Sequence, residues 1–540
     1  MSESVWWKSG IIYQIYPRSF QDGNGDGIGD IEGIRSRLDY LVRLGIDAVW
    51  LSPFYPSPMA DFGYDIADYC NVDPRFGSLE DFDALLADAH LRNLRVIVDL
   101  VPNHTSDRHP WFVESRSSRE NPKRDWYLWR DPNPRGGPPN NWLSNFGGPA
   151  WTLDPATDQY YFHAFLKEQP DLNWRNPAVR AAMYDVMRFW LKRGVDGFRI
   201  DVLYHLVKDD LFRDNPSNQH ATPSEQSSHA VIPFYTTDRP EVQDIVIEMR
   251  RVSDEFGDGE SQRVLIGEIY LPVERLMAYY GLSEEGVLSG VQLPFNFQLI
   301  AAAWEAPVID RIVREYEAAL PNGAWPNWVL GNHDKSRIAS RVGSEQARVA
   351  AVLLLTLRGT PTMYYGDEIG MRDVAIAPDE VQDPFERNEP GKGVGRDPER
   401  TPMQWDSSSN AGFTTGRPWL RLGDDWPHRN VAVLERDGQS ILALYKRLIE
   451  LRRRHAALTR GSYEAIASEG QLFAFVRVHD HDRLLVVVNF GGTQVTVPAA
   501  ILPSPASVLL STRPDRDAAF ETPLVLDPNE AVIVAPVGNS

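Results

Sequence analysis

The chain has 540 residues and a formal net charge of −20, from 55 Lys and Arg against 75 Asp and Glu. A negative field of this size repels phosphate backbones and anionic lipid, so nucleic acids and membrane surfaces are poor candidate partners. Hydrophobic residues make up 42% of the sequence, which excludes disorder over most of the chain.

The cysteine content and the hydropathy pattern indicate in which cellular compartment the protein lies. Cys70 is the single cysteine, which excludes an intrachain disulfide framework and fits a reducing compartment. Residues 1–8 contain no apolar run that could serve as a signal peptide, and no stretch of about 18 apolar residues follows. We therefore expect a soluble, cytoplasmic protein without membrane contact.

Short apolar runs rich in β-branched residues predict eight strands. They span residues 11–16, 48–51, 95–100, 197–202, 264–269, 291–295, 328–331 and 361–365. Helical patterns lie between them, with a predicted helix start at Ser78 and a predicted helix end at Gly194. Eight strands alternating with helices predict a (β/α)₈ TIM barrel. The alternative, two doubly wound domains, lacks a Gly-rich phosphate loop after the first strand.

Two insertions and a change of pattern divide the chain. Residues 104–172 are too long for a bare loop and predict an inserted subdomain B after the third strand, and residues 371–400 form a second insertion. After a helix predicted over residues 441–458, period-two runs predict an antiparallel β-sandwich. We expect a catalytic barrel over residues 1–103 and 173–458, interrupted by subdomain B, and a C-terminal β-sandwich over residues 459–540.

Ionisable side chains end four of the predicted strands, at the edge where parallel barrels place their active sites. Pairing with one another or helix capping would explain any one of them, but three carboxylates converging on one mouth favour a catalytic site. The set comprises His104, Arg199, Asp201, Glu268, His333 and Asp334.

The residue types in this set indicate a reaction class. No Ser or Cys lies in a nucleophile elbow and no His-Glu-x-x-His zinc motif occurs, whereas two carboxylates flanking one bond are what glycoside hydrolysis requires. Arg199 lies two residues before Asp201 on the same strand face and favours its ionised form, as a nucleophile needs. Glu268 follows an apolar run, where burial favours the protonated form that a proton donor needs.

Six motifs in chain order resemble those of one family. The segments DLVPNH (99–104), GFRID (197–201), GEIY (267–270) and NHD (332–334) are similar to the four signature regions of the α-amylase family of glycoside hydrolases. QPDLN (169–173) resembles the pentapeptide of its oligo-1,6-glucosidase and α-glucosidase subfamily, and GTPTMYYG (359–366) resembles the eighth-strand region. The resemblance runs from Ile12 through the C-terminal sandwich.

The resemblance implies a role for each matching residue. Asp201 would be the nucleophile that forms a covalent β-glucosyl intermediate, and Glu268 the general acid/base. Asp334 would bind sugar hydroxyls and stabilise the distorted ring. Hydrogen bonds to the nucleophile or to the same sugar are implied for Arg199, His104 and His333.

Members of the family that release one glucose from a chain end close their pocket with an Asp and an Arg, and the resemblance places these at Asp61 and Arg400. We expect an ion pair there to exclude longer chains and so to give exo action. Tyr64 would stack on the sugar face. Phe162 is a further candidate for substrate contact, and a core position is an equally good interpretation of it.

The segment DGNGDGIGD (22–30) places oxygen ligands at every second residue of a Gly-rich loop, which is how a chain wraps a hard cation. Compared with an EF-hand loop, Gly33 stands where the bidentate Glu would be, so a solvated acidic turn is the alternative. The resemblance implies a structural Ca²⁺ or Mg²⁺ and no organic cofactor. The candidate ligands are Asp22, Asn24, Asp26, the Ile28 carbonyl and Asp30.

The leading hypothesis is a retaining exo-α-glucosidase that acts on small α-glucosides such as maltose, isomaltose, sucrose or short oligosaccharides. The alternatives are an oligo-1,6-glucosidase or dextran glucosidase, and a glucosyl transferase or isomerase such as a trehalose or isomaltulose synthase, because a sugar can capture the same intermediate. A non-catalytic, transporter-associated barrel is disfavoured because all three carboxylates are present. Val202 favours α-1,6 cleavage whereas His205 departs from the Asn expected with it, so linkage preference and oligomeric state stay open.

Overall fold

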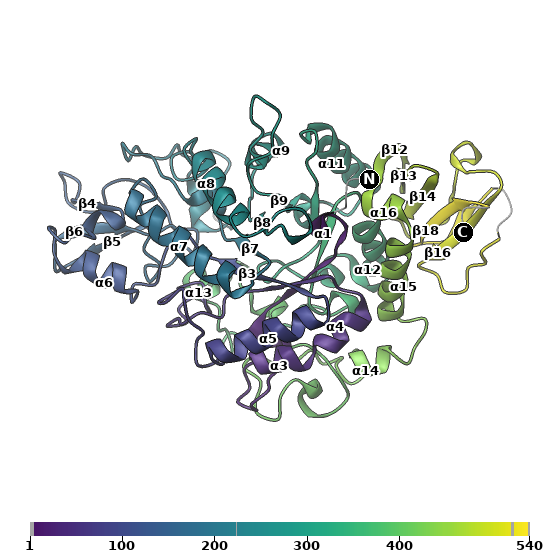
Figure 1. The fold of residues 1–540 in the computed structure, drawn as a ribbon, viewed down its shortest axis with the longest axis horizontal. Coiled ribbons are helices and arrows are strands. Elements are labelled where there is room, and N and C mark those ends of the chain that lie inside the picture. The colour runs from purple at the N-terminus through teal and green to yellow at the C-terminus, as the bar shows by residue number, and fades with distance from the viewer. Residues whose placement is uncertain (1–4, 223, 520–522, 538–540) are drawn as a thin grey trace.

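The fold is a closed parallel barrel with one domain-sized addition at either side (Figure 1). The computed structural model describes residues 5–222, 224–519 and 523–537, and within them eight strands close in the order β1-β11-β10-β9-β8-β7-β3-β2. All eight predicted barrel strands are confirmed, with differences of a few residues at their ends. They are β1 (Ile12–Ile15), β2 (Ala48–Leu51), β3 (Arg95–Leu100), β7 (Gly197–Ile200), β8 (Val264–Gly267), β9 (Leu293–Asn296), β10 (Asn327–Val329) and β11 (Thr360–Tyr364).

Helices cover the barrel because each buries one apolar face. On α7, residues at three- and four-residue spacing from Val179 to Trp190 are fully buried, as the sequence predicts. The longer covering helices are α3 (Ile31–Ser36), α4 (Leu38–Leu44), α5 (Leu79–Leu91), α7 (Pro177–Arg193), α8 (Val242–Asp254), α11 (Ala306–Ala319), α12 (Ile338–Thr356) and α15 (Ile441–Arg454). The remaining α-helices are α1 (Trp6–Ser9), α2 (Pro17–Phe20), α6 (Pro110–Ser117), α9 (Val273–Leu276), α10 (Gln298–Ala301), α13 (Pro384–Asn388), α14 (Val431–Leu434) and α16 (Ala456–Arg460).

The predicted helix ends are confirmed by their capping geometry. The side chain of Ser78 accepts from the Asp81 backbone at the start of α5, and Gly194 closes α7 in the left-handed region at φ 108°. The single helix predicted over residues 441–458 is wrong in one respect. His455 has extended backbone and its imidazole pairs with Asp482 at 2.9 Å, which separates α15 from α16.

A small antiparallel sheet lies between β3 and α7, in the order β4-β6-β5. Its strands are β4 (Trp129–Arg130), β5 (Trp151–Asp154) and β6 (Gln159–Phe162). Trp142, Trp151 and Phe162 form its aromatic core together with Leu128. The long insertion is therefore a packed unit rather than a loop.

The C-terminal segment folds into a five-stranded antiparallel sheet, in the order β12-β13-β14-β18-β16, and a two-stranded sheet. Successive side chains of β13 point to opposite faces, so Phe473 and Phe475 pack toward the barrel while Leu472 and Val476 pack toward the smaller sheet. The period-two prediction is confirmed, although β12 and β17 were not predicted. The strands are β12 (Ser462–Glu469), β13 (Leu472–His479), β14 (Asp482–Asn489), β15 (Val495–Thr496), β16 (Ala506–Ser511), β17 (Val525–Leu526) and β18 (Ala531–Pro536).

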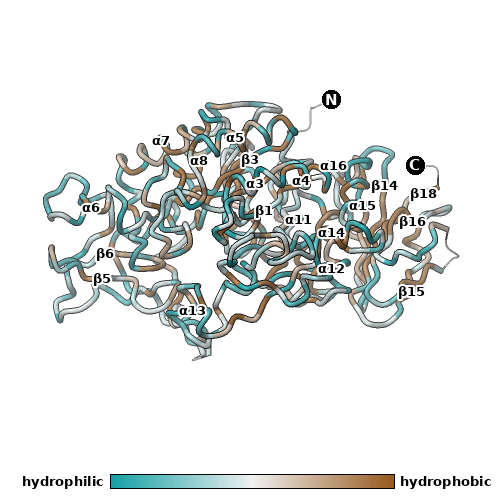
Figure 2. Tube along the Cα trace, turned by 90° about the horizontal axis from the view of Figure 1, so that it is seen from below, coloured by the Kyte–Doolittle hydropathy of each residue, from teal (hydrophilic) through white to brown (hydrophobic). Residues whose placement is uncertain are grey.

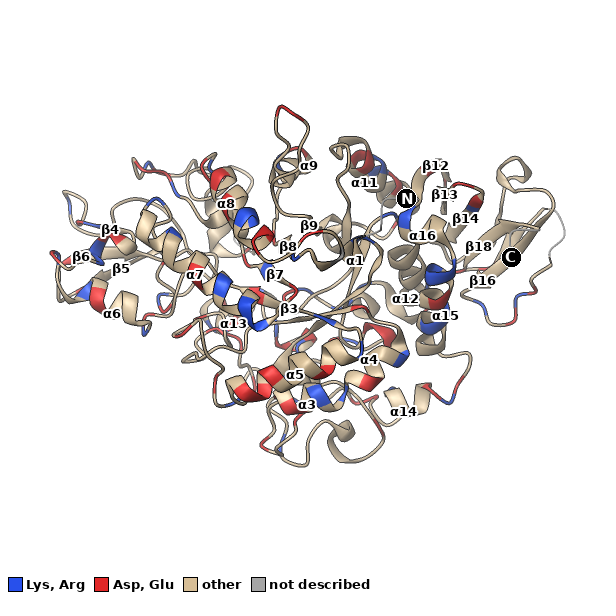
Figure 3. Cartoon of the chain, in the orientation of Figure 1, with Lys and Arg blue, Asp and Glu red and all other residues tan. Residues whose placement is uncertain are grey.

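The two additions lie at opposite ends of the long axis in both views of the trace, with the inserted sheet at one end and hydrophobic C-terminal strands at the other (Figure 2). Charged residues of both signs are distributed over the covering helices (Figure 3). Within the described part of the chain, no helix is both long and apolar enough to span a bilayer.

Candidate active site

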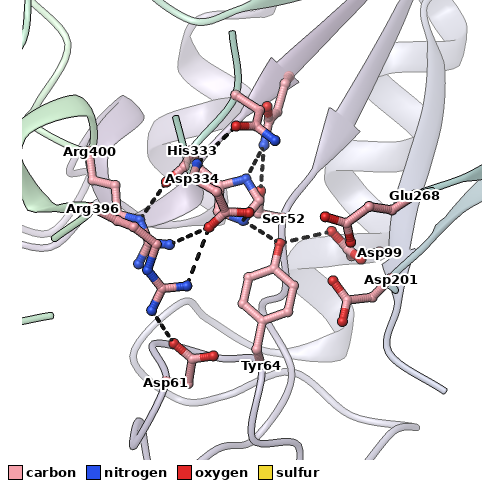
Figure 4. Close-up of polar contacts among 12 residues, drawn as sticks. Ser52, Asp61, Tyr64, Asp99, Asp201, Glu268, His333, Asp334, Arg396 and Arg400 are labelled. Carbon is pink, nitrogen blue, oxygen red and sulfur yellow. Dashed lines mark hydrogen bonds and ion pairs between the residues drawn. The ribbon is translucent and has the colours of Figure 1, made fainter. Parts of the chain in front are cut away.

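A cavity of about 560 Å³ opens at the carboxyl ends of the barrel strands. Most of the predicted catalytic and substrate residues reach it from the segments that follow β2, β3, β7, β8 and β10. Those that line it are His104 and the residues Asp61, Tyr64, Asp201, Glu268, His333 and Asp334. Figure 4 labels all of these except His104. The convergence that the strand-end argument predicted is therefore present.

Arg199 holds three carboxyl groups behind the cavity wall. Its side chain is fully buried, and the strand register places Asp99 of β3 directly beside it. One guanidinium nitrogen, Nη1, lies 2.9 Å from Asp99 Oδ1 and 2.6 Å from Asp201 Oδ1, and Nη2 lies 2.6 Å from Glu268 Oε2. A single fixed cation thus sets the positions of both predicted reacting carboxyl groups.

Burial acts on the ionisation of the carboxyl groups in this cluster. Burial raises the pKa of Asp201 well above its usual range; Arg199 opposes the rise, and Glu268 and Asp99 reinforce it. Burial also raises the pKa of Asp99 to about 7, against the effect of Arg199. Arg199 lowers the pKa of Asp201, as the sequence predicts, but burial and the two neighbouring carboxyl groups outweigh this effect.

An unusual backbone conformation at Val202 orients Glu268. Val202 has φ 36° and ψ 45°, a left-handed conformation that β-branched residues rarely adopt. This turn aims the Val202 N–H at Glu268 Oε2, to which it donates at 2.9 Å. Because Arg199 contacts the same oxygen, the carboxyl group is held from one side by both.

Tyr64 and His333 form a stacked pair between Asp99 and the cavity. Their rings are nearly parallel, at an angle of 4° with centroids 5.3 Å apart, and the Tyr64 hydroxyl lies 2.8 Å from His333 Nε2. The same hydroxyl donates to Asp99 Oδ2 at 3.2 Å, and Gln14 Nε2 lies 2.8 Å from His333 Nδ1. Tyr64 lines the cavity, and its stacking on a sugar stays a prediction.

Asp334 is the most exposed of the predicted catalytic carboxyl groups, with 22% of its side chain accessible. It lies 2.8 Å from Arg400 Nη2, 3.3 Å from Arg396 Nη1 and 3.4 Å from His333 Nε2. Burial works against its ionisation, but the basic side chains of His333, Arg396, Arg400 and Arg199 outweigh burial and lower its pKa well below the usual range. Burial lowers the pKa of His333 well below its usual range, so the full positive charges near Asp334 are the guanidinium groups of Arg396, Arg400 and Arg199.

The closed end of the cavity requires a correction. Asp61 is paired with Arg396, at 2.7 Å, and not with Arg400. Arg396 also lies 2.7 Å from Asp383, whereas Arg400 donates to the His333 carbonyl at 2.7 Å and reaches Asp334. The two arginines lie either side of the 3₁₀ turn Asp397–Glu399, so both side chains enter from one segment. The sequence alone does not show which of the two arginines pairs with Asp61, because that depends on where Asp61 lies in the folded structure.

Phe162 does not line the cavity and lies in the core of the inserted sheet, 1% exposed, so its substrate role is wrong. Phe165, three residues further along the chain, lines the cavity instead. Gln169 belongs to the QPDLN segment and is not among the predicted site residues. It lines the cavity, and its Nε2 donates to Asp61 Oδ2 at 3.2 Å. The predicted residue His104 is neutral, because burial lowers its pKa to about 4.

The predicted metal loop lies between β1 and α3. Asp22 accepts from the Gly25 and Gly27 amides at 2.7 and 2.8 Å, and Asp30 accepts from Gly23 and Gly33. Both Gly25 and Gly27 have positive φ, and a Cβ on Gly27 would lie 1.9 Å from the carbonyl oxygen of residue 417. The side-chain and carbonyl oxygens are the donors that Ca²⁺ and Mg²⁺ prefer. No group of three or more His, Cys, Asp or Glu in the described ranges could hold a metal, so amide and carbonyl oxygens would have to complete the site.

A parallel barrel that gathers three carboxyl groups on one arginine at the strand carboxyl ends has the arrangement expected of a glycoside-cleaving enzyme. Residues 14–461 match the model of the "Alpha amylase, catalytic domain" family, and residues 459–533 match a "Domain of unknown function (DUF3459)". The chain belongs to the α-amylase family of glycoside hydrolases.

Similar proteins of known sequence or structure cover nearly the whole chain. A probable α-glucosidase of Rhizobium meliloti (strain 1021) is 43% identical, over 91% of this chain and 90% of its own length. An oligo-1,6-glucosidase of Halalkalibacterium halodurans is 39% identical, over 97% of this chain and 98% of its own. A solved α-glucosyl transfer enzyme has a TM-score of 0.91 at 37% identity, covering 98% of this chain and 99% of its own.

Proposed function

We propose that this glycoside hydrolase is an exo-acting α-glucosidase that releases one glucose from the non-reducing end of short α-glucosides. The observation that carries the proposal is the blind end of the cavity, where the buried pair of Asp61 and Arg396 stands beside Asp334. Buried charges held by hydrogen bonds at fixed positions recognise the hydroxyls of a terminal sugar and leave no path for a longer chain. Relatives named α-glucosidase and oligo-1,6-glucosidase support the same substrate class.

In this proposal the reaction proceeds with retention of configuration. The productive form has Asp201 ionised as the nucleophile and Glu268 protonated as the general acid. Asp201 attacks the anomeric carbon, the C1–O bond breaks toward the leaving oxygen, and Glu268 gives that oxygen its proton. Glu268 then takes a proton from water, whose oxygen attacks C1 and displaces Asp201, so glucose leaves in its original α configuration.

The remaining cavity residues bind the ring in this scheme. Asp334 is ionised and accepts hydrogen bonds from sugar hydroxyls, and Arg400 keeps it in place. The neutral imidazoles of His104 and His333 exchange hydrogen bonds with the ring without adding positive charge beside the developing oxocarbenium ion. Positioning of this kind supplies a large part of the rate of such reactions.

Transfer is the second candidate function, and similarity to a solved α-glucosyl transfer enzyme favours it. The covalent intermediate is common to both reactions, so the products depend on whether water or a sugar reaches C1 first. Val202 and His205 both line the cavity next to Asp201, and their combination leaves α-1,4 and α-1,6 linkages as equal candidates.

The test is a comparison of maltose, isomaltose, sucrose and an aryl α-glucoside as substrates, with all sugars quantified. Hydrolysis gives monosaccharides alone, whereas new disaccharides or trisaccharides indicate transfer. Proton NMR of the first turnovers distinguishes α-glucose from β-glucose. Initial release of β-glucose, or efficient internal cutting of starch, would contradict the proposal.

We also propose that the loop of residues 22–30 binds a structural Ca²⁺ or Mg²⁺. The side chains of Asp22, Asn24, Asp26 and Asp30 and the carbonyl of Ile28 would hold the ion, with no part in bond cleavage. Support comes from the oxygen donors of these residues and from the loop's glycines, which let the loop pack closely against the segment around residue 417.

A cytoplasmic location is proposed on the basis of Cys70. It is the single cysteine of the chain and can form no intrachain disulfide, which fits a reducing compartment. Fractionation of cells that express the full chain would test this location.

A further inference from the structure

The insertion that follows β11 meets two other segments at the rim of the cavity. Phe385 of α13 stacks on Phe146 of the inserted subdomain, with ring centroids 4.8 Å apart at 27°, and both rings line the cavity. The third segment is residues 225–231, in the long connection between β7 and α8, which contributes Gln226 to the lining. Three stretches far apart in the sequence therefore form one edge of the opening.

Glu389 joins these segments. It follows the last residue of α13 and is 7% exposed. Its carboxylate accepts from the Ser227 N–H at 3.2 Å through Oε2 and from the Ser227 hydroxyl through Oε1. The Ser227 oxygen in turn accepts from the Gly148 N–H at 3.2 Å. One carboxylate thus anchors the 225–231 segment, which is itself bonded to the inserted subdomain.

The fit around this carboxylate depends on Gly147. Its φ is 94°, in the left-handed region, and a Cβ there would lie 2.4 Å from Glu389 Oε1. Any other residue would be strained and would displace the carboxylate. The contact is therefore built into the backbone of the inserted subdomain as well as into Glu389.

Gln226 is held on both sides by bonds to the insertion. Ser227, which follows it, is bonded to Glu389, and the carbonyl of Glu225, which precedes it, accepts from Lys392 Nζ. Lys392 Nζ also lies 3.7 Å from Glu389 Oε2. Two neighbouring backbone anchors leave the Gln226 side chain little freedom to leave the rim.

We propose that Glu389 is a positioning residue that holds Gln226 at the rim, where the group attached to the transferred glucose lies. The inference rests on the proposed α-glucosidase function. An amide held at that place exchanges hydrogen bonds with a polyhydroxylated leaving group or acceptor, that is, a second sugar, and has nothing to offer a small leaving atom. Glu389 thereby affects the choice of leaving group and acceptor without touching the reacting bond.

The activity test compares maltose with α-glucosyl fluoride, whose leaving group is a single atom that does not extend to the rim. Glu389→Ala should raise the KM for maltose five- to tenfold and leave kcat/KM for the fluoride within twofold of the parent. Glu389→Gln keeps one acceptor and should recover most of the maltose affinity. The matched control is Glu380→Ala, which removes an exposed carboxylate of the same insertion. It should leave the KM and kcat/KM for both substrates unchanged.

A double-mutant cycle distinguishes loss of the hydrogen bonds between Glu389 and Ser227, here called the tie, from a general loss of stability of the fold. Ser227→Ala should add little in the Glu389→Ala background, because its partner is already gone. Equal losses on maltose and fluoride would mean that Glu389 only stabilises the fold, and no loss on either would mean that the tie does not matter; both results overturn the proposal. If the parent cleaves neither substrate, the α-glucosidase function fails, and the tie is judged by the following measurement alone.

That measurement uses no substrate. A Glu-specific endoprotease should cut the chain after Glu225 at least tenfold faster in Glu389→Ala than in the parent or in Glu380→Ala, with the fragment identified by mass spectrometry. Faster cleavage at this bond, with thermal melting unchanged within a few degrees, supports a local tie. Identical cleavage rates in the parent and Glu389→Ala would show that Glu389 does not hold the segment.

Discussion

Replacing Arg396 by Met should damage the enzyme more than the same change at Arg400. Arg396 is 8% exposed and lies within 3.3 Å of three carboxyl groups, on Asp61, Asp383 and Asp334. Removing one member of a buried ion pair costs about 3–5 kcal/mol, because the remaining charge stays uncompensated. Arg396→Met leaves two such charges, on Asp61 and Asp383, whereas Asp334 keeps Arg400 at 2.8 Å.

We expect Arg396→Met to lower kcat/KM on maltose about 100- to 1000-fold, which corresponds to about 3–4 kcal/mol of lost transition-state binding. It should also lower the free energy of unfolding. Arg400→Met removes one carboxylate contact and leaves Asp334 with Arg396, so its effect on stability should be smaller.

The interaction with Asp61 gives the sharper test. In the parent, Asp61→Asn leaves Arg396 with two other carboxylates, so some activity is lost. In the Arg396→Met background the same change removes an unpaired buried charge and should restore stability. Kinetics on maltose and urea unfolding of the two single variants and the double variant measure the coupling. Additive losses, or a stronger coupling of Asp61 to Arg400 than to Arg396, would refute the reasoning.

Three further predictions follow from the site and the core. Asp201→Asn and Glu268→Gln should each lower kcat by orders of magnitude, and azide should rescue Asp201→Gly with a β-glucosyl azide product; normal turnover by either amide variant would remove that residue from the mechanism. Asp22→Ala should lower Tm and abolish stabilisation by added Ca²⁺ or Mg²⁺ while kcat at moderate temperature changes little, and equal metal sensitivity in variant and parent would reduce the loop to a turn. Burial lowers the pKa of His163 to about 4, so the native state keeps it neutral while the unfolded chain takes up a proton below pH 6.5, and its contribution to stability is lost as the pH falls from 6.5 toward 4. Between pH 7 and pH 5 the free energy of unfolding of His163→Gln, measured with urea, should therefore fall by about 2 kcal/mol less than that of the parent. The same pH dependence in both proteins would contradict this.

The parts of the molecule that could be predicted are those whose cause is local. Each barrel strand is a short apolar run, and parallel strands meet at one edge, so the positions of Asp201, Glu268 and Asp334 follow from the chain order alone. The same holds for the C-terminal sheet, where Phe473 and Phe475 alternate with residues that face the other way. Period and strand direction are properties of the sequence itself.

The parts that could not be predicted depend on distance in space between remote segments. Arg396 and Arg400 stand on one short segment, and which of them reaches Asp61 depends on how residues 383–400 fold over the cavity. Phe162 and Phe165 differ by three residues, and the strand β6 places the first in the core of the inserted sheet. The protonation of Asp201 depends on Asp99, a strand neighbour whose charge competes for the same guanidinium.

The insertion after β11 contributes both to the Asp61–Arg396 pair and to the rim of the cavity. Asp383 caps the start of α13 and also holds Arg396 through its guanidinium and its backbone N–H, while Glu389 stands at the other end of the same helix. Because α13 is five residues long, a displacement of Asp383 moves Glu389 with it. If Arg396 closes the sugar-binding end and Glu389 positions the rim, then recognition of the terminal glucose and recognition of its partner depend on one short helix. Substitutions in that helix should change both specificities together, whereas substitutions in the barrel strands should change the chemistry alone.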